Sequence, residues 1–164
     1  MSYQLYWLAG SPYSWRALLS LEIKGLAYEG KLLSGANREH KAPAFLALNP
    51  RGKVPVLTDG DTVVCDSLAI MMYLDRKHPT PSLFGENAVE TGRIFQVMGE
   101  LGDFLAPAAT TFVNIVFGGQ VRNKVAEAKE LAQEILKELD HFDGVLGTRP
   151  FLVDDKLRAA DVML

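Results

Sequence analysis

The sequence is poor in features that mark secreted, membrane-spanning or nucleic-acid-binding proteins. Cys65 is the single cysteine, so no disulfide can form within the chain, which is typical of proteins from reducing compartments. No apolar run approaches the roughly 20 residues of a membrane-spanning helix, and residues 1–16 lack the basic start and apolar core of a secretory signal. No basic cluster is present, and a net charge of −3 attracts neither nucleic acid nor an anionic membrane. These absences predict a cytoplasmic protein without nucleic-acid or membrane partners.

Spacings typical of metal ligands are also missing. His78 precedes a proline in a loop-like stretch, and His141 lies near the end of a helical pattern. Neither is spaced from Cys65 or from another histidine as the ligands of a metal site usually are. We therefore expect both histidines to be structural and the protein to work without a metal.

The first part of the chain alternates between strand and helix patterns. A strand–helix–strand opening implies a parallel pair of strands. Asp59–Gly60 lies between two β-rich runs, which predicts an antiparallel hairpin. The sequence therefore predicts an α/β domain over residues 1–77 with a mixed, four-stranded sheet. The expected strands cover residues 3–8, 27–33, 54–57 and 62–65, and the expected helices cover residues 12–24, 38–48 and 67–77.

The character of the sequence changes after residue 77. Residues 78–87 contain two prolines and a glycine, which predicts a linker. Residues 88–117 and 121–146 then show helical periodicity with almost no strand signal. Because Gly118–Gly119 separates these two stretches, they should pair as antiparallel helices. Residues 88–164 are therefore expected to form an all-α domain.

A proline stands at the head of the third expected strand. Pro55 cannot donate a hydrogen bond to a β-ladder. A cis peptide bond between Val54 and Pro55 would turn the Val54 backbone toward a cleft, where an extended peptide could dock as an added strand. A trans-proline at the start of an edge strand is the simpler alternative.

Two helix starts carry polar groups suited to ligand binding. Asp66 and Ser67 open the helix at 67–77, where free N–H groups can hold a carboxylate and the Asp66 side chain can hold an amine. Ser11 precedes Pro12 at another helix start, where its hydroxyl and the helix dipole could stabilise a thiolate. Taken singly, each start also fits a plain N-cap.

The order and spacing of these pieces are more specific than the pieces themselves. A strand-to-helix "SP" is followed by "HKAPAFLALNPRGKVPVL", "DSLAI" and a proline-rich linker into helical sequence. This arrangement resembles the cytosolic glutathione S-transferases, and most of all their serine-type phi, tau, theta and zeta classes. The resemblance covers essentially the whole chain and is strongest over residues 40–77. It implies a thioredoxin-like N-terminal domain, an all-α C-terminal domain, glutathione as co-substrate, a hydrophobic electrophilic substrate, a cytoplasmic homodimer and a role in detoxification.

The resemblance also implies a set of site residues. Ser11 matches the serine whose hydroxyl activates the glutathione sulfur. Tyr6, in a Tyr–Trp pair like that of the tyrosine-type classes, is the alternative, and Tyr13 and Ser14 lie close by. The residues that match glutathione-binding positions are His40, Lys41, Lys53, Val54, Pro55, Asp66 and Ser67. The electrophile pocket would come from Phe104, Ala108, Thr111, Phe112 and Ile115.

The sequence departs from the family pattern in several places. Serine replaces the cysteine of the omega and beta classes at position 11, which disfavours disulfide chemistry, and the zeta signature is only partly met. Arg158 stands where the family has a serine or threonine three residues before Asp161, so the usual capping side chain is missing. The helical domain at 88–164 is short relative to the family. The alternatives are a non-catalytic glutathione-binding or assembly module and a glutathione-dependent isomerase, peroxidase or dehalogenase.

Overall fold

The computed structural model describes residues 3–164, which fall into two compact units that meet between Leu83 and Phe84. This boundary lies within the segment 78–87, whose role as a linker stays a prediction. The elements of the first unit are β1 (Tyr3–Trp7), α1 (Pro12–Ile23), β2 (Tyr28–Leu32), the 3₁₀ helix η1 (Glu39–Lys41), α2 (Pro43–Leu48), β3 (Val56–Asp59), β4 (Thr62–Cys65) and α3 (Ser67–Lys77).

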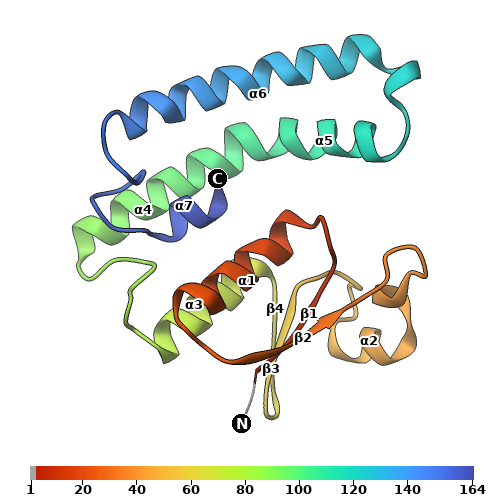
Figure 1. Cartoon of the computed structure of the whole chain (residues 1–164), viewed down its shortest axis with the longest axis vertical. Helices are drawn as coiled ribbons and strands as arrows, with labels where there is room; N and C mark the ends of the chain where they lie inside the picture. Colours follow the sequence, from red (N-terminus) through yellow and green to blue (C-terminus); the bar gives the residue numbers. More distant parts are fainter. Residues whose placement is uncertain (1–2) are drawn as a thin grey trace. The chain divides into compact units, whose positions relative to one another are not determined.

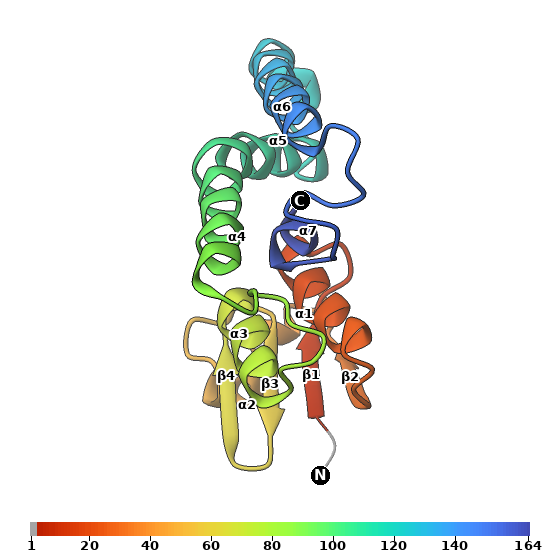
Figure 2. The ribbon, with the colours of Figure 1, turned by 90° about the vertical axis from the view of Figure 1, so that its left-hand side faces the viewer.

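The four strands form one mixed sheet in the order β2-β1-β3-β4 (Figure 2). β1 and β2 are parallel, whereas β1–β3 and β3–β4 are antiparallel, as the sequence predicts. The predicted start of β3 at residue 54 is wrong, because the strand begins at Val56. Pro55 has no N–H to donate to the ladder, so pairing starts only after it.

Alternation along β1 sends side chains to both faces of the sheet. Leu5 is fully buried in a core that α1 and α3 cover, together with Leu21, Leu57 and Ile70. Tyr6 lies on the opposite face, where its ring contacts the ring of Phe45 in α2 at a centroid distance of 6.0 Å. Figure 1 shows α1 and α3 on one side of the sheet and α2 on the other. Helices therefore pack on both faces of the sheet, while the edge strands β2 and β4 keep exposed residues.

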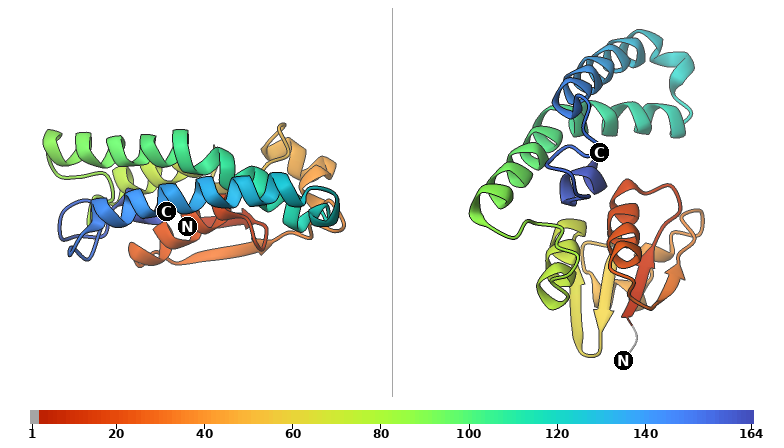
Figure 3. Two further views of the ribbon diagram at one scale, coloured as in Figure 1. Left: turned by 90° about the horizontal axis from the view of Figure 1, so that it is seen from above. Right: turned by 60° about the vertical axis from the view of Figure 1, so that its left-hand side comes forward.

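The second unit is all helical. Its elements are α4 (Ala88–Glu100), the π-helix η2 (Leu101–Leu105), α5 (Ala106–Phe117), the 3₁₀ helix η3 (Val121–Asn123), α6 (Val125–Leu146) and α7 (Ala159–Met163). α5 and α6 pack side by side and run in opposite directions (Figure 3), as expected from the Gly118–Gly119 break.

The helical stretches differ from the sequence prediction in two details. The stretch 88–117 is interrupted by η2, where the Ala106 N–H bonds to the Leu101 carbonyl five residues earlier. Pro107 follows directly and cannot donate to the regular α-helical ladder, which accounts for a wider turn at this point. The second long helix begins at Val125 and not at residue 121, because residues 121–123 form the separate 3₁₀ turn.

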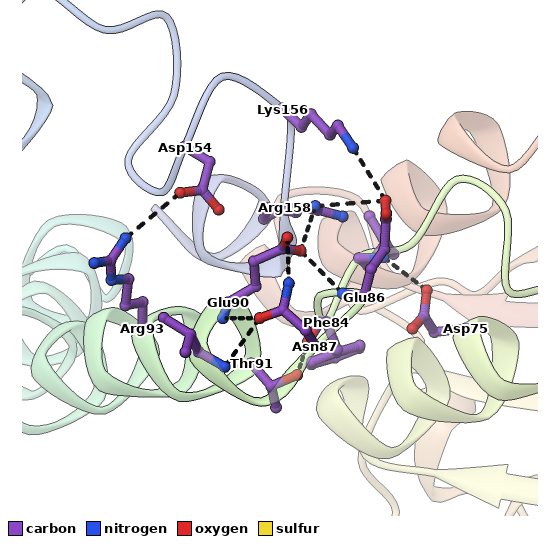
Figure 4. Close-up of polar contacts among 12 residues, drawn as sticks. Asp75, Phe84, Glu86, Asn87, Glu90, Thr91, Arg93, Asp154, Lys156 and Arg158 are labelled. Carbon is purple, nitrogen blue, oxygen red and sulfur yellow. Dashed lines mark hydrogen bonds and ion pairs between the residues drawn. The ribbon is translucent and has the colours of Figure 1, made fainter.

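Arg158 stands at the start of α7, where the family pattern has a serine or threonine. Its side chain does not cap the helix and forms an ion pair with Glu90. Its guanidinium has only donors and cannot accept a bond from the helix, and it instead donates to Glu90 Oε2 at 2.8 Å (Figure 4). The Asp161 carboxylate still supplies its half of the cap by accepting the Arg158 N–H at 2.8 Å. It also accepts the Leu152 N–H at 2.8 Å. The helix start is therefore held by Asp161 alone, while Arg158 joins it to α4.

Asp59, at the β3–β4 turn, makes the fold sensitive to acid. Lys77 and the Tyr73 hydroxyl, at 2.6 Å, both donate to its carboxylate, and these bonds lower the pKa of Asp59. Because the folded-state pKa lies below that of the unfolded chain, the stabilisation is present above about pH 4 and is lost as the pH falls. We expect Asp59→Asn to lower the melting temperature by a few degrees at pH 7 and by less at pH 3.

Thermal unfolding at both pH values would test this expectation. Asp61→Asn is the matched control, because Asp61 lies exposed in the same turn. A loss of melting temperature in the Asp59 variant that is equal at both pH values would contradict the role of its charge.

Candidate functional site

The strand register brings three chain segments to one edge of the sheet. Tyr6 of β1 pairs with Val56 of β3, which pairs with Cys65 of β4. Because β3 runs opposite to its neighbours, the ends of β1 and β4 meet the beginning of β3 at this edge. Residues 8–11, 53–55 and 66–67 therefore converge, although up to 59 residues separate them in the sequence.

A cavity of about 550 Å³ opens at this edge, and all of its lining belongs to the first unit. Its lining includes five of the residues predicted to bind glutathione, Lys53, Val54, Pro55, Asp66 and Ser67. Tyr13, which the sequence analysis named as a hydroxyl close to Ser11, also lines it, and the sequence reasoning missed the three remaining lining residues, Asn49, Arg51 and Cys65. The two motifs that carry the resemblance thus share one cavity.

The loop before β3 is held in shape by Asn49. The Val54–Pro55 peptide bond is cis. The Asn49 amide donates to the Lys53 carbonyl at 2.8 Å and accepts the Arg51 N–H at 3.1 Å. Asn49 is almost fully buried, so this loop has a fixed conformation beside the cavity. Asn49 directly precedes Pro50, and such an Asn–Pro pair marks a turn. This signal could have added Asn49 and Arg51 to the predicted site.

Asp66 has an unusual backbone conformation. Its φ of 82° lies in the region that favours glycine, and holding another residue there costs roughly 1–3 kcal/mol. Its Oδ1 caps α3 by accepting the N–H groups of Leu68 at 2.9 Å and Ala69 at 3.3 Å. The following Ser67 is buried, while Asp66 is exposed. Strain of this kind is found at ligand-binding positions.

Charges of opposite sign line the cavity. Asp66 supplies a carboxylate, and Arg51 and Lys53 supply two cations. Burial raises the pKa of the Cys65 thiol, and the neighbouring Asp66 charge raises it further. Since a neutral thiol is a poor nucleophile, Cys65 is not suited to be the reacting group. The cavity is thus suited to a small ligand that carries both an ammonium and carboxylates.

Three hydroxyl groups near the end of β1 differ in what they can reach. Ser11 is half-buried and caps α1 by accepting the Ser14 N–H at 3.3 Å, which leaves its own proton to donate. The Ser14 side chain is fully buried and accepts the Leu8 N–H. The Tyr6 hydroxyl donates to Gln4 at 3.4 Å, on the sheet face that α2 covers. Ser11 does not itself line the cavity, but Tyr13, two residues further along, does.

Two of the residues predicted to bind glutathione, Lys41 and His40, do not line this cavity. Lys41 donates to the backbone carbonyl of Gly52 at 2.7 Å, so its ammonium supports the loop and does not line the cavity. His40 is also outside the lining, and burial together with the nearby charges of Lys41, Arg38 and Lys53 lowers its pKa. A neutral imidazole at pH 7 is a weak partner for a carboxylate.

The residues predicted for the electrophile pocket are dispersed within the second unit. Ala108 and Ile115 are buried in its interior, and the Thr111 hydroxyl donates to the Pro107 carbonyl of its own helix at 3.0 Å. Phe104 is 62% exposed and lines a recess with Glu100, Lys137, Glu138 and His141. Phe112 is half-buried. Their role toward an electrophile stays a prediction.

Residues 3–164 contain no group of three or more His, Cys, Asp or Glu side chains that could hold a metal ion. Within the same residues, every helix is too short or too polar to cross a membrane.

Comparisons with known proteins agree on one family. Residues 10–77 match the family model described as "Glutathione S-transferase, N-terminal domain". Glutathione S-transferase 4 of Zea mays is 37% identical over 97% of this chain and 73% of its own length. Glutathione S-transferase F10 of Arabidopsis thaliana is 32% identical over 90% of this chain and 71% of its own length.

The fold agrees with these sequence relatives. The crystal structure of a glutathione S-transferase from the Antarctic clam Laternula elliptica superposes with a TM-score of 0.86 and 34% identity. That match covers 99% of this chain and 74% of the clam chain. The thioredoxin-like first unit and the helical second unit are therefore confirmed. The chain belongs to the glutathione S-transferase family.

Proposed function

We propose that the chain is a glutathione transferase that activates the glutathione thiol for attack on a hydrophobic electrophile. The observation that carries this proposal is the single cavity that contains both the Val54–Pro55 turn and the Asp66–Ser67 helix start. Family membership supports the same reaction class.

Each part of glutathione has a matching group in the cavity. The Asp66 carboxylate binds the γ-glutamyl ammonium, while Ser67 and the first N–H groups of α3 bind the adjacent carboxylate. The Val54 backbone pairs with the cysteinyl part in the manner of an added strand. Lys53 binds the glycyl carboxylate, and Arg51 takes the place predicted for Lys41, whose ammonium is bound to the loop.

The chemistry then depends on the charge of the bound thiol. A free thiol has a pKa near ~8.5, so little thiolate exists at neutral pH. Ser11 donates a hydrogen bond to the sulfur, and the N-terminus of α1 adds its positive partial charge. Lowering the pKa by two units requires about 2.7 kcal/mol. A charge-assisted hydrogen bond of roughly 1.5–3 kcal/mol can supply most of this.

The thiolate displaces a leaving group from the electrophilic carbon. A carbon–sulfur bond forms, the bond to the leaving group breaks with its electron pair, and the thiol proton passes to solvent. The electrophile is held by the second unit at Phe104, Ala108, Thr111, Phe112 and Ile115, and no metal takes part.

The active form is a cytoplasmic homodimer with a role in detoxification. Exposed apolar side chains of the second unit, of which Phe117 is 86% exposed, support a partner surface.

An activated aryl halide tests the proposed reaction. With glutathione and 1-chloro-2,4-dinitrobenzene, we expect formation of the dinitrophenyl thioether with a kcat of roughly 1–100 s⁻¹. S-methylglutathione, which lacks the thiol proton, should bind but give no product. Glutathione binding without turnover of aryl halide, hydroperoxide or alkyl halide would instead favour a non-catalytic binding module.

A further inference from the structure

A second cavity lies wholly within the first unit, at the edge strand β2 (Figure 2). Its volume is about 540 Å³, and none of the described residues lines both this cavity and the one at Val54 and Asp66. Cavities that bind small molecules usually measure about 300–1,000 Å³. The lining residues come from β1, α1, β2 and the turn that joins α1 to β2, and they are Trp7, Leu18, Glu22, Leu26, Ala27, Tyr28 and Gly30.

Gly30 keeps this second cavity open. It lies in the interior of β2 opposite Leu5, and its φ lies outside the left-handed region, so the backbone does not require glycine there. Glycine weakens the interior of a strand and often marks a place where a ligand comes close. A β-carbon at this position would lie 3.3 Å from Trp7 Nε1 and 3.8 Å from Tyr28 Cε2. The missing side chain therefore leaves room beside both aromatic rings.

The indole of Trp7 brings a hydrogen-bond donor to the same place. The ring packs against the core that contains Leu5, together with the lining residues Leu18 and Leu26. Trp7 Nε1 is buried and has no hydrogen-bond partner among residues 3–164. An indole N–H can only donate, and a buried donor without an acceptor is destabilising. Because the space over Gly30 adjoins this nitrogen, an oxygen of a bound molecule can accept its hydrogen bond.

Glu22 gives the cavity a negative charge. Its Oε1 accepts the Tyr28 hydroxyl at 2.9 Å, which holds the carboxylate beside the Tyr28 ring. Burial and this bond raise the pKa of Tyr28, so its hydroxyl stays neutral at pH 7. Every other lining residue that the structure describes is uncharged. Glu29 and Lys31, on either side of Gly30, point to the opposite face of the sheet and pair with each other.

We propose that this second cavity binds a small aromatic amine that carries an oxygen acceptor. The ammonium pairs with Glu22, the oxygen accepts from the Trp7 N–H, and the ring packs over Gly30 against Leu18 and Leu26. An anion of the same shape is repelled by the carboxylate, and a purely apolar molecule leaves both polar groups without partners. This inference goes beyond the proposed transferase function and does not depend on it.

Three probes of similar size test the chemistry of the ligand. Tyramine has both the ammonium and the oxygen, phenethylamine lacks the oxygen, and 3-(4-hydroxyphenyl)propionate has a carboxylate in place of the amine. We expect a Kd of roughly 0.1–1 mM for tyramine, in keeping with its small size. Phenethylamine should bind about threefold more weakly and the propionate at least about tenfold more weakly. An NMR titration of the Trp7 indole N–H signal gives each Kd, and the Trp15 signal should not move.

Variants of the lining test the three contacts separately. Glu22→Gln keeps an oxygen for Tyr28 but loses the charge, so tyramine should bind at least about tenfold more weakly. Gly30→Ala fills the space beside the indole and should weaken binding about fivefold or more. Trp7→Phe, followed by calorimetry, should remove the advantage of tyramine over phenethylamine. Glu29→Gln is the matched control, because it removes a carboxylate of the same strand from outside the lining, and its Kd should stay within twofold of the wild type.

The result does not hinge on the variant that is hardest to fold. Glu22 is exposed, so Glu22→Gln should fold even where Gly30→Ala does not. No movement of the Trp7 signal at about 10 mM tyramine would overturn the proposal. So would equal losses in the Glu22 and Glu29 variants, because the amine would then respond only to the net charge of the protein. Equal affinity for the amine and the carboxylate probe would overturn it as well. Selective tyramine binding by a protein that does not conjugate the aryl halide would support this site and refute only the transferase function.

Discussion

Replacing Ser11 with alanine should lower kcat for the aryl halide by about 10- to 150-fold, which corresponds to the loss of one charge-assisted hydrogen bond. The Kd for glutathione should change by less than threefold, because the proposed binding groups Val54, Asp66 and Ser67 are untouched. Only the thiolate gains from the hydroxyl, so the loss should fall on the reactive form and not on binding of the neutral thiol.

The pH dependence of the same variant supplies a second signature. Without the Ser11 donor the thiolate is less favoured, so the pKa of the bound thiol should rise. The rising limb of the kcat/KM profile should then shift to higher pH, and part of the lost rate should return in alkaline solution. Ultraviolet absorbance of the bound thiolate would report that pKa directly. An Ser11→Ala enzyme with wild-type rate and pH profile would exclude Ser11 as the activating group.

Controls must separate activation from helix capping. Ser11 Oγ also accepts the Ser14 N–H, so the alanine variant should lose about 1 kcal/mol of stability. Ser11→Thr keeps both the hydroxyl and the cap and should keep most of the activity. Tyr6→Phe removes only a phenol that bonds to Gln4, and its rate should stay within twofold of the wild type. A large loss in Tyr6→Phe would transfer the activating role to Tyr6.

Local signals in the sequence predict much of the fold. Pro12, Gly25 and the Asp59–Gly60 turn mark element ends that agree with the structure to within one or two residues. Each of these signals depends on residues close together in the chain, where backbone sterics and capping decide the outcome.

Features that the sequence did not predict depend on long-range contacts or on backbone detail. The bonds of Lys24 to Asp75 and residues beyond it join positions more than 50 apart, and nothing near Lys24 indicates them. Lys41 has the residue type of a carboxylate ligand, yet two loop carbonyls bind its ammonium. The π-turn at 101–105 depends on how one proline is accommodated within a longer helix. Residue type and spacing alone do not settle such competition between partners.

Changing Asp66 should separate binding from stability. Asp66→Ala keeps the strained backbone and loses the cap, so it should lower stability by about 1 kcal/mol. Asp66→Gly relieves the strain of the positive φ, which should stabilise the folded state by roughly 1–3 kcal/mol. Glycine is a weaker cap and costs only about a few tenths of a kcal/mol. The more flexible unfolded chain lowers the stability by a further 0.4–1 kcal/mol or so, about the usual effect of glycine. The glycine variant should therefore be as stable as the wild type to within a few tenths of a kcal/mol, or up to about 2 kcal/mol more stable, although both variants lose the carboxylate.

Both variants should nevertheless bind glutathione about tenfold or more weakly, since each loses the charged partner of the γ-glutamyl ammonium. Asp66→Asn leaves the backbone strain about the same and keeps the capping oxygen, so its stability should be close to that of the wild type while its affinity falls. Calorimetry would give Kd, and thermal unfolding would give stability. A glycine variant that is more stable but binds weakly would show that the strained aspartate is retained for the ligand. Wild-type affinity in all three variants would remove Asp66 from the γ-glutamyl site.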